Sequence, residues 1–221
     1  MILVRGEGES LSRVERAWEG ETVVCIATGP SLSEAQIALV RASGARVIAV
    51  NDAYLMAPFA DVVYFADVKW HGWHKDREEF RAFAGQKCSI FIGVDPKLGP
   101  GVHLLKQAGY MGLSNDPTEI VTGSNSGYQA INIAALSGAR RIVLLGYDAQ
   151  PRDGKHHFFG AHPDKSHAPY DVIRGRFRDL VQPLRKLGVE VFNATPGSAI
   201  SCFGYTDLAA SLESHPRSPV V

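Results

Sequence analysis

The sequence predicts one α/β domain in which a Rossmann-like, mainly parallel sheet is flanked by helices. Short β-branched apolar runs alternate with amphipathic segments in units of about 30 residues, which is the pattern of strands joined by crossover helices. The 221 residues suffice for one sizeable core. A content of 45% hydrophobic and 21% charged residues is typical of a globular protein.

The first half of the chain contains four predicted strands. The run from Thr22 to Thr28 is apolar throughout its middle, as expected of a strand that is buried on both faces of a parallel sheet. Gly29 breaks this run, Ser33 can cap the next helix, and Gly44 can end that helix. The predicted elements are strands at 22–28, 46–50, 61–66 and 88–94 and helices at 34–43 and 74–84.

The second half begins with an apparent interruption of this pattern. Residues 95–122 are rich in Gly, Pro and Asn, and we expect them to be irregular. The run 141–148, RIVLLGYD, is the clearest strand of the chain. Further predicted elements are helices at 126–137 and 170–187, a strand at 189–194 and a polar loop at 149–168. We expect the domain to cover residues 1–210 and residues 211–221 to form a loose tail.

Composition excludes several classes of partner. Lys and Arg total 23, as do Asp and Glu, so the formal net charge is zero. A neutral chain has no overall attraction for nucleic acid or an anionic membrane, which leaves nucleic acid as a partner only where it is a reaction acceptor. No membrane span and no secretory signal are expected. Cys25, Cys88 and Cys202 are far apart in the sequence, which favours reduced thiols in a cytoplasmic protein. The composition does not decide whether the chain forms a homo-oligomer.

Polar residues follow several predicted strands, and ligands of parallel sheets bind beyond the carboxyl ends of the strands. The turn Gly29-Pro30-Ser31 follows the first predicted strand, and Asn51, Asp67 and Asp148 follow three others. Gly29 lets a ligand approach the backbone, and the helix start after it offers N–H groups to a phosphate. An ordinary strand-to-helix turn explains the same residues equally well. The turn matches neither the dinucleotide fingerprint nor a P-loop.

A second turn of small polar residues, Thr122–Gly127, opens a later helix. Ser126 and Gly127 stand at the helix start, where N–H groups can hold a phosphate, a ribose or a base; simple helix capping is the alternative. Two such turns in one parallel sheet favour a ligand site. Trp70 and Trp73 follow the third strand and either stack on a ligand ring or cover the sheet edge.

The loop after Asp148 is the main catalytic signal. Residues 155–167 hold four of the eight histidines, and histidine can act as a base near neutral pH or ligate a metal. No cysteine is near and the spacing fits no zinc pattern, so we expect no metal site. A solvated loop that happens to be rich in histidine is the alternative, and His156 and His167 are expected at its surface.

Four short motifs occur in order along residues 23–203. They are Gly29-Pro30-Ser31-Leu32, Asn51, Ser126-Gly127 with the strand that ends at Asp148, and His157–His162 followed by a helix, a strand and Asn193. With these motifs the chain resembles the superfamily that joins bacterial sialyltransferases of the Campylobacter type with archaeal 6-hydroxymethylpterin diphosphokinase-like proteins. Phage and prophage members are common in that superfamily, so the resemblance implies a bacterial or phage-infected host.

The resemblance to the sialyltransferases implies a nucleotide-activated donor of the CMP-sugar type and no metal in the chemistry. His162 takes the position of the base that deprotonates an acceptor hydroxyl, with His157 as its rival, and Asp148 would orient the ribose or the acceptor. Those enzymes use tyrosines to help the phosphate leave, whereas here Arg152, Lys155 or His156 would have to do so. With the strand-end argument, the residues expected to hold the nucleotide are Gly29, Pro30, Ser31, Asn51, Asp67, Ser126 and Gly127.

The pterin kinase branch carries a His-x-His-Gly-Asp loop. Here Ala161 stands in the place of the Asp, a natural magnesium ligand, and the second His is absent as well. The leading interpretation is therefore a glycosyltransferase-like transferase with no tightly bound cofactor and an acceptor still to be identified. The alternatives are a pterin pyrophosphokinase-like enzyme, which alone would need Mg²⁺ and ATP, and a non-catalytic phage protein that binds a nucleotide.

Overall fold

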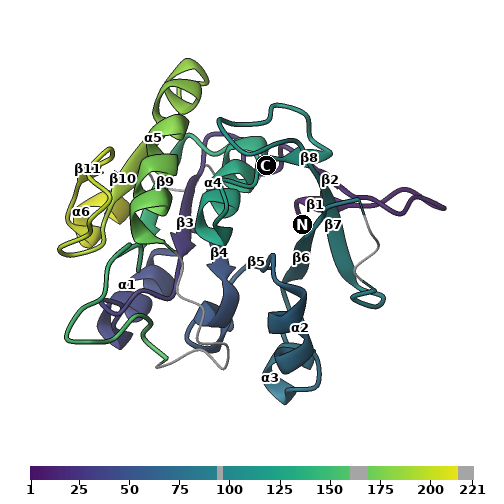
Figure 1. Ribbon diagram of the computed structural model, residues 1–221, viewed down its shortest axis with the longest axis horizontal. Helices are drawn as coiled ribbons and strands as arrows, with labels where there is room; N and C mark the ends of the chain where they lie inside the picture. Colours follow the sequence, from purple (N-terminus) through teal and green to yellow (C-terminus); the bar gives the residue numbers. More distant parts are fainter. Residues whose placement is uncertain (94–96, 160–168, 214–221) are drawn as a thin grey trace.

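The computed structural model describes residues 1–93, 97–159 and 169–213. It confirms the predicted fold class, because a nine-stranded parallel sheet with helices on both faces forms a single α/β domain (Figure 1). Across the sheet the strand order is β11-β10-β9-β3-β4-β5-β6-β7-β8. The central strands are β3 (Thr22–Ile26), β4 (Arg46–Val50), β5 (Val62–Tyr64), β6 (Gln86–Phe91), β9 (Arg141–Leu145) and β10 (Glu190–Asn193).

The expectation of an irregular excursion at 95–122 is wrong in part. Strand β7 (Val102–Gln107) pairs with β6, and β8 (Glu119–Ile120) pairs with β7. In β7 the buried Val102 and Leu105 share the strand with the exposed Lys106, so no continuous apolar run reveals it. Also not predicted were β11 (Gly204–Tyr205) and the small antiparallel pair β1 (Leu3–Val4) and β2 (Arg13–Val14).

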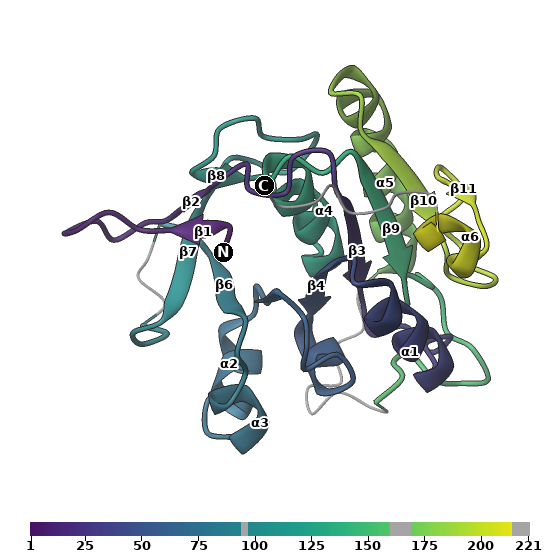
Figure 2. The same cartoon turned by 180° about the vertical axis from the view of Figure 1, so that it is seen from behind.

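Helices cover both faces of the sheet. One face carries α4 (Ser126–Leu136) and α5 (Tyr170–Lys186), which Figure 1 shows in front of the strands. The other face carries α1 (Glu34–Ser43), the 3-10 helix η1 (Asn51–Leu55) and α6 (Leu208–Glu213); Figure 2 shows α1 and α6 from that side. The helix predicted at 74–84 is instead two short helices, α2 (Val68–His74) and α3 (Glu78–Arg81).

Two predicted ends of elements are also corrected. The strand predicted to reach Asp148 ends at Leu145, because Gly146 has a φ of 71° and turns the chain. The tail predicted to be loose from residue 211 begins inside α6, where Ser211 is buried.

Of the cysteines, Cys25 and Cys88 are buried and Cys202 is half-buried, and all three are free thiols. Over the described ranges, no helix has the length and apolar character that crossing a membrane requires.

The order of the strands creates a topological switch point between β3 and β9, at the carboxyl ends of the strands. From β3 the chain builds outward through β4 to β8, crosses back through α4, and adds β9 on the opposite side of β3. The helix after β3 packs on one face and the helix after β9 on the other. The connections after β3 and β9 therefore diverge and leave a crevice between them, which is the usual ligand position in such sheets.

Candidate functional site

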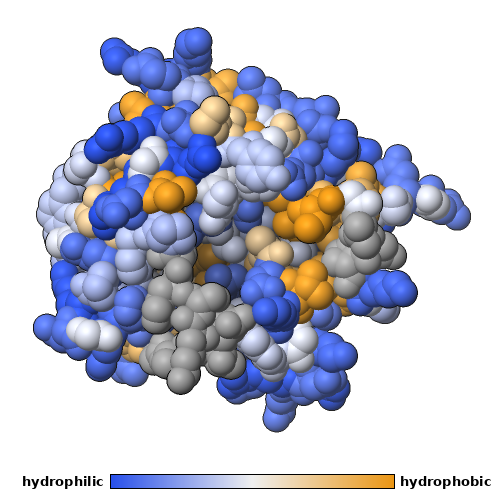
Figure 3. Space-filling view, viewed as in Figure 1, coloured by the Kyte–Doolittle hydropathy of each residue, from blue (hydrophilic) through white to orange (hydrophobic). Residues whose placement is uncertain are grey.

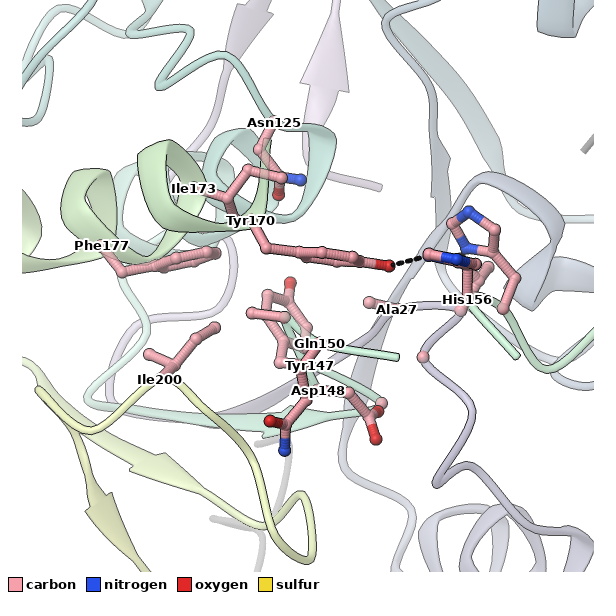
Figure 4. A pocket seen from close by; sticks show the side chains of 15 residues that line it. Ala27, Asn125, Tyr147, Asp148, Gln150, His156, Tyr170, Ile173, Phe177 and Ile200 are labelled. Carbon is pink, nitrogen blue, oxygen red and sulfur yellow. Dashed lines mark hydrogen bonds between the residues drawn. The ribbon is translucent and has the colours of Figure 1, made fainter. Parts of the chain in front are cut away.

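A cavity of about 130 Å³ lies at this crevice between β3 and β9 (Figure 4). The loop after β3 contributes one wall and the loop after β9 a second. The start of α4, the first half of α5 and the segment between β10 and β11 contribute the remainder. The lining residues are Ala27, Thr28, Gly29, Asn125, Gly146, Tyr147, Asp148, Ala149, Gln150, His156, His157, Tyr170, Ile173, Phe177 and Ile200. Sequence positions separated by more than 170 residues thus converge on one site, as the strand-end argument predicted for Gly29 and Asp148.

Asp148 holds the turn after β3 in place. The Ser31 hydroxyl donates to Asp148 Oδ2 at 2.8 Å, and the Ser31 backbone N–H donates to Oδ1 at 3.2 Å. A side chain at Gly29 would collide with the same carboxylate and with the Gly146 carbonyl oxygen. The surrounding protein atoms therefore require glycine at position 29, whether or not a ligand approaches it. Burial raises the pKa of Asp148, and the hydrogen bonds from Ser31 oppose that rise.

The start of α4 faces the same cavity through Asn125. Asn125, rather than Ser126, is the N-cap, and its side-chain oxygen accepts from the Tyr128 N–H at 3.2 Å. The Gly127 carbonyl accepts from the Tyr147 hydroxyl at 3.0 Å, which ties the helix start to the loop after β9. The Thr122 hydroxyl in the preceding turn is buried and has no hydrogen-bond partner. Capping therefore explains part of this motif, and the helix start still borders the cavity.

His156 and His157 contact opposite walls of the cavity. His156 Nδ1 lies 3.0 Å from the Tyr170 hydroxyl, and Figure 4 shows that hydroxyl directed at the imidazole ring. His157 Nδ1 lies 3.3 Å from Thr28 Oγ1, while the Phe158 N–H donates to the Thr28 carbonyl at 2.8 Å. The expectation that His156 belongs to the loop surface is wrong, because it is half-buried and lines the cavity.

Arg152 and Lys155 lie outside the cavity lining. The Arg152 guanidinium donates to the Pro196 carbonyl at 2.7 Å, and the added carbon of a side chain at Gly197 would meet it. Lys155 is exposed, and its backbone exchanges two hydrogen bonds of 2.9 Å with Arg152 in a tight turn. Neither basic residue lines the cavity, whereas the next residue, His156, does. The Arg152 charge still acts on the Asp148 carboxylate and opposes the rise of its pKa.

Of the seven residues expected to hold the nucleotide, Gly29 lines the cavity, whereas Pro30, Ser31, Asn51, Asp67, Ser126 and Gly127 lie outside its lining. Asn51 follows β4, has a φ of 50°, and carries a buried side-chain oxygen without a hydrogen-bond partner. Asp67 caps α2 by accepting from the Lys69 N–H at 2.8 Å. Of the two tryptophans that were expected either to stack on a ligand ring or to cover the sheet edge, Trp70 is a core residue. Its ring is stacked on Phe65 with centroids 4.9 Å apart, and its Nε1 donates to Asp52.

His162, the predicted base, lies outside the described residues. The sequence did not point to Tyr170 or Gln150 as cavity residues, and it named His156 only as one of three residues that could help a phosphate leave. Tyr170 is the first residue of α5, and no motif marked it; the only available signal was that α5 begins where the polar loop ends. Burial, followed by the negative charge of Asp148, raises the pKa of Tyr170, so its hydroxyl keeps its proton near neutral pH.

Three further findings concern possible metal sites, the surface and the relation to known proteins. Within residues 1–93, 97–159 and 169–213, no three His, Cys, Asp or Glu side chains gather in a way that could hold a metal ion. In the space-filling view the face with α4 and α5 is largely hydrophilic, with apolar side chains gathered on the side where β6 and β7 lie (Figure 3). No protein-family model matches the chain, and no curated protein matches it significantly.

Proposed function

We propose that the protein is a glycosyltransferase-like transferase that binds a nucleotide-activated donor of the CMP-sugar type in the crevice between β3 and β9. The supporting observation is the convergence of a helix start, a buried carboxylate and two imidazole rings on one cavity at the switch point of the sheet. Sheets of this topology bind their ligands there. Acid–base side chains beside such a crevice suit group transfer to a hydroxyl.

Each part of the site has a role in this proposal. The cavity of about 130 Å³ is smaller than the roughly 300 Å³ or more of a typical ligand pocket, so it takes only the reacting part of the donor. The nucleoside then lies along the open crevice. Asp148 keeps the turn at Ser31 in position and can accept a hydrogen bond from a ribose or acceptor hydroxyl. The base belongs to the loop after β9, with His162 proposed first and His157 second.

Binding of CMP and a CMP-sugar tests the proposal most directly. We expect either ligand to stabilise the protein against thermal unfolding in the presence of EDTA. A ligand at 100 times its dissociation constant adds about 2.7 kcal/mol. Binding that appears only after Mg²⁺ and ATP are added, together with transfer of a diphosphate group from ATP to a pterin alcohol, would favour the kinase branch instead. Failure of every nucleotide to bind would overturn the proposal.

A matched pair of variants locates the ligand. Ala27→Leu adds three carbon atoms to a half-buried residue of the cavity wall. Ala42→Leu adds the same atoms at an exposed position of α1. We expect Ala27→Leu to weaken CMP binding at least 10-fold and Ala42→Leu to leave it unchanged, with both proteins folded by circular dichroism. Equal binding by the two variants would place the ligand elsewhere.

A further inference from the structure

A second cavity, of about 720 Å³, lies beside β6 and β7 on the face of the sheet that carries α1. It shares no lining residue with the cavity between β3 and β9. Its volume falls within the range of roughly 300–1,000 Å³ that is usual for small-ligand pockets, whereas the volume of the first cavity is well below that range. The second cavity is therefore large enough for a complete small molecule.

This cavity lies where the sheet lacks a crossover helix. Neighbouring parallel strands are usually joined by a helix that packs on the sheet. On this face α1 joins β3 to β4, and α2 and α3 join β5 to β6. In the connection from β6 to β7, the described residues, 92–93 and 97–101, form no helix. The side of β7 that carries Val102 and Leu104 therefore borders an open space instead of a packed helix.

Three segments enclose this space: the strands β6 and β7, the loop that precedes β7, and the N-terminal segment. The N-terminal segment is tied to the edge of β7, because the Ser12 N–H donates to the Leu104 carbonyl at 2.8 Å, and Figure 2 shows the segment beside that strand. Large apolar side chains of the lining are those of Leu11, Phe91, Leu98, Val102 and Leu104. Walls of this kind favour a hydrocarbon over water.

The charged residues of the described lining are all basic. Arg5 and Lys97 line the cavity, and no Asp or Glu does. The Arg5 side chain is held in place, because its Nε donates to Ser12 Oγ at 3.3 Å and its Nη2 donates to the Val102 carbonyl. A guanidinium has five N–H groups, so these two contacts leave donors for an anion.

The acidic residues closest to Arg5 in the sequence do not line the cavity. Glu9 accepts from the Gly6 N–H at 3.1 Å within its own turn, and Glu7 is exposed. The lining thus combines apolar walls with a cation that is fixed by two hydrogen bonds. This combination suits a ligand that has an apolar chain and one anionic group.

We propose that the second cavity binds an amphiphilic carboxylate of the class of medium-chain fatty acids. The apolar chain lies against Phe91, Leu98 and Leu104, in the space that a crossover helix would otherwise fill. The carboxylate accepts hydrogen bonds from Arg5, whose planar guanidinium matches the two oxygens of such a group. The site is separate from the crevice of the proposed transferase and does not depend on that function.

Isothermal titration calorimetry with octanoate tests the inference on the full chain. 1-Octanol is the uncharged reference, and acetate is the reference without a chain. We expect octanoate to saturate a single site and acetate not to bind. 1-Octanol should bind about 10-fold or more weakly than octanoate, because a hydrogen bond between charged groups is lost. Vesicles of phosphatidylglycerol should not bind the protein, because the cavity takes a free acid.

Two variants separate the contribution of the charge from that of the space. In Arg5→Gln the octanoate affinity should fall about 10-fold, to that of 1-octanol, whose own affinity stays constant. Its control is Arg13→Gln, because Arg13 is exposed, pairs with Glu15 and lies outside the lining. Leu104→Trp fills the cavity and should abolish binding of both ligands. Its control is Leu39→Trp, at an exposed position of α1, and circular dichroism verifies the fold of all four proteins.

The outcomes that contradict the inference are distinct. Absence of octanoate binding to the wild-type protein, or unchanged binding in Leu104→Trp, overturns it. Equal affinities for octanoate and 1-octanol, or an unchanged octanoate affinity in Arg5→Gln, overturn the assignment of the carboxylate to Arg5. Binding to the vesicles in preference to octanoate would mean that this face meets a membrane surface, and would overturn the choice of a free acid. The proposed function stands or falls separately, by the binding of CMP in the other cavity.

Discussion

Replacement of Gly29 by alanine should destabilise the protein through two contacts that cannot both relax. The added carbon would collide with Asp148 Oδ2 and with the Gly146 carbonyl oxygen. The carboxylate is anchored by hydrogen bonds of 2.8 and 3.2 Å from Ser31, and the carbonyl already accepts from the Gly29 N–H at 2.8 Å. Displacing the carboxylate sacrifices bonds worth about 1.5 kcal/mol or more each, and overpacking alone costs about 1–3 kcal/mol.

We therefore expect Gly29→Ala to lower the free energy of unfolding by about 2–4 kcal/mol, measured by urea denaturation followed by circular dichroism. Gly175→Ala is the control, because Gly175 lies within α5 and an added carbon there meets nothing within 4 Å. Gly175→Ala should stabilise the protein by about 0.5–1 kcal/mol, because alanine has a higher helix propensity than glycine.

A double variant tests the mechanism. Asp148→Ala in the Gly29→Ala background removes one of the two collisions, so its effect should be smaller than the sum of the two single changes. A Gly29→Ala protein as stable as the wild type would refute the reasoning, since it would mean that the turn moves freely away from β9. Strict additivity of the two changes would show that the carboxylate does not oppose the added carbon.

Two further predictions concern histidines. Once a donor is identified, His162→Ala should reduce turnover about 100- to 10,000-fold with little change in nucleotide affinity, whereas a near-normal rate in His162→Ala and a dead His157→Ala would reverse the assignment of the base. Burial, and then the charge of Arg5, lowers the pKa of His103 from 6.5, so the unfolded chain binds a proton first and stability is lost as the pH falls below about 6.5. His103→Gln should weaken this fall in urea denaturation between pH 7 and 5, and equal pH dependence in both proteins would contradict it.

Local patterns were sufficient to predict the central strands and the long helices. Thr22–Ile26 and Arg141–Leu145 are short apolar runs bounded by glycine, and α5 carries its buried residues at helical spacing. The alternation of strands and helices then implied a parallel sheet with a ligand crevice at its carboxyl edge. Strand β7 was not predicted, because polar and apolar residues mix within it and glycine and proline flank it.

The identity of the cavity residues could not be predicted in the same way. Asp148 and Ser31 are separated by 117 positions, and nothing in either segment marks their hydrogen bond. His156 and His157 look alike in sequence, yet one meets Tyr170 and the other Thr28. Such pairings depend on how the loop after β9 folds back over the strand ends, and many loop paths satisfy the same local preferences.

By itself, the sequence determined the class of fold, the position of the crevice at the strand ends, and the presence of Gly29, Asp148 and a histidine loop at that edge. Hydrophobic periodicity and turn residues are properties of short segments, so the local sequence is sufficient to recognise them. Tertiary structure alone decided that Arg152 and Lys155 lie outside the cavity lining and that His156 lines the cavity beside Tyr170. Those choices follow from packing between segments distant in sequence, because each buried polar group must find its partner across the fold.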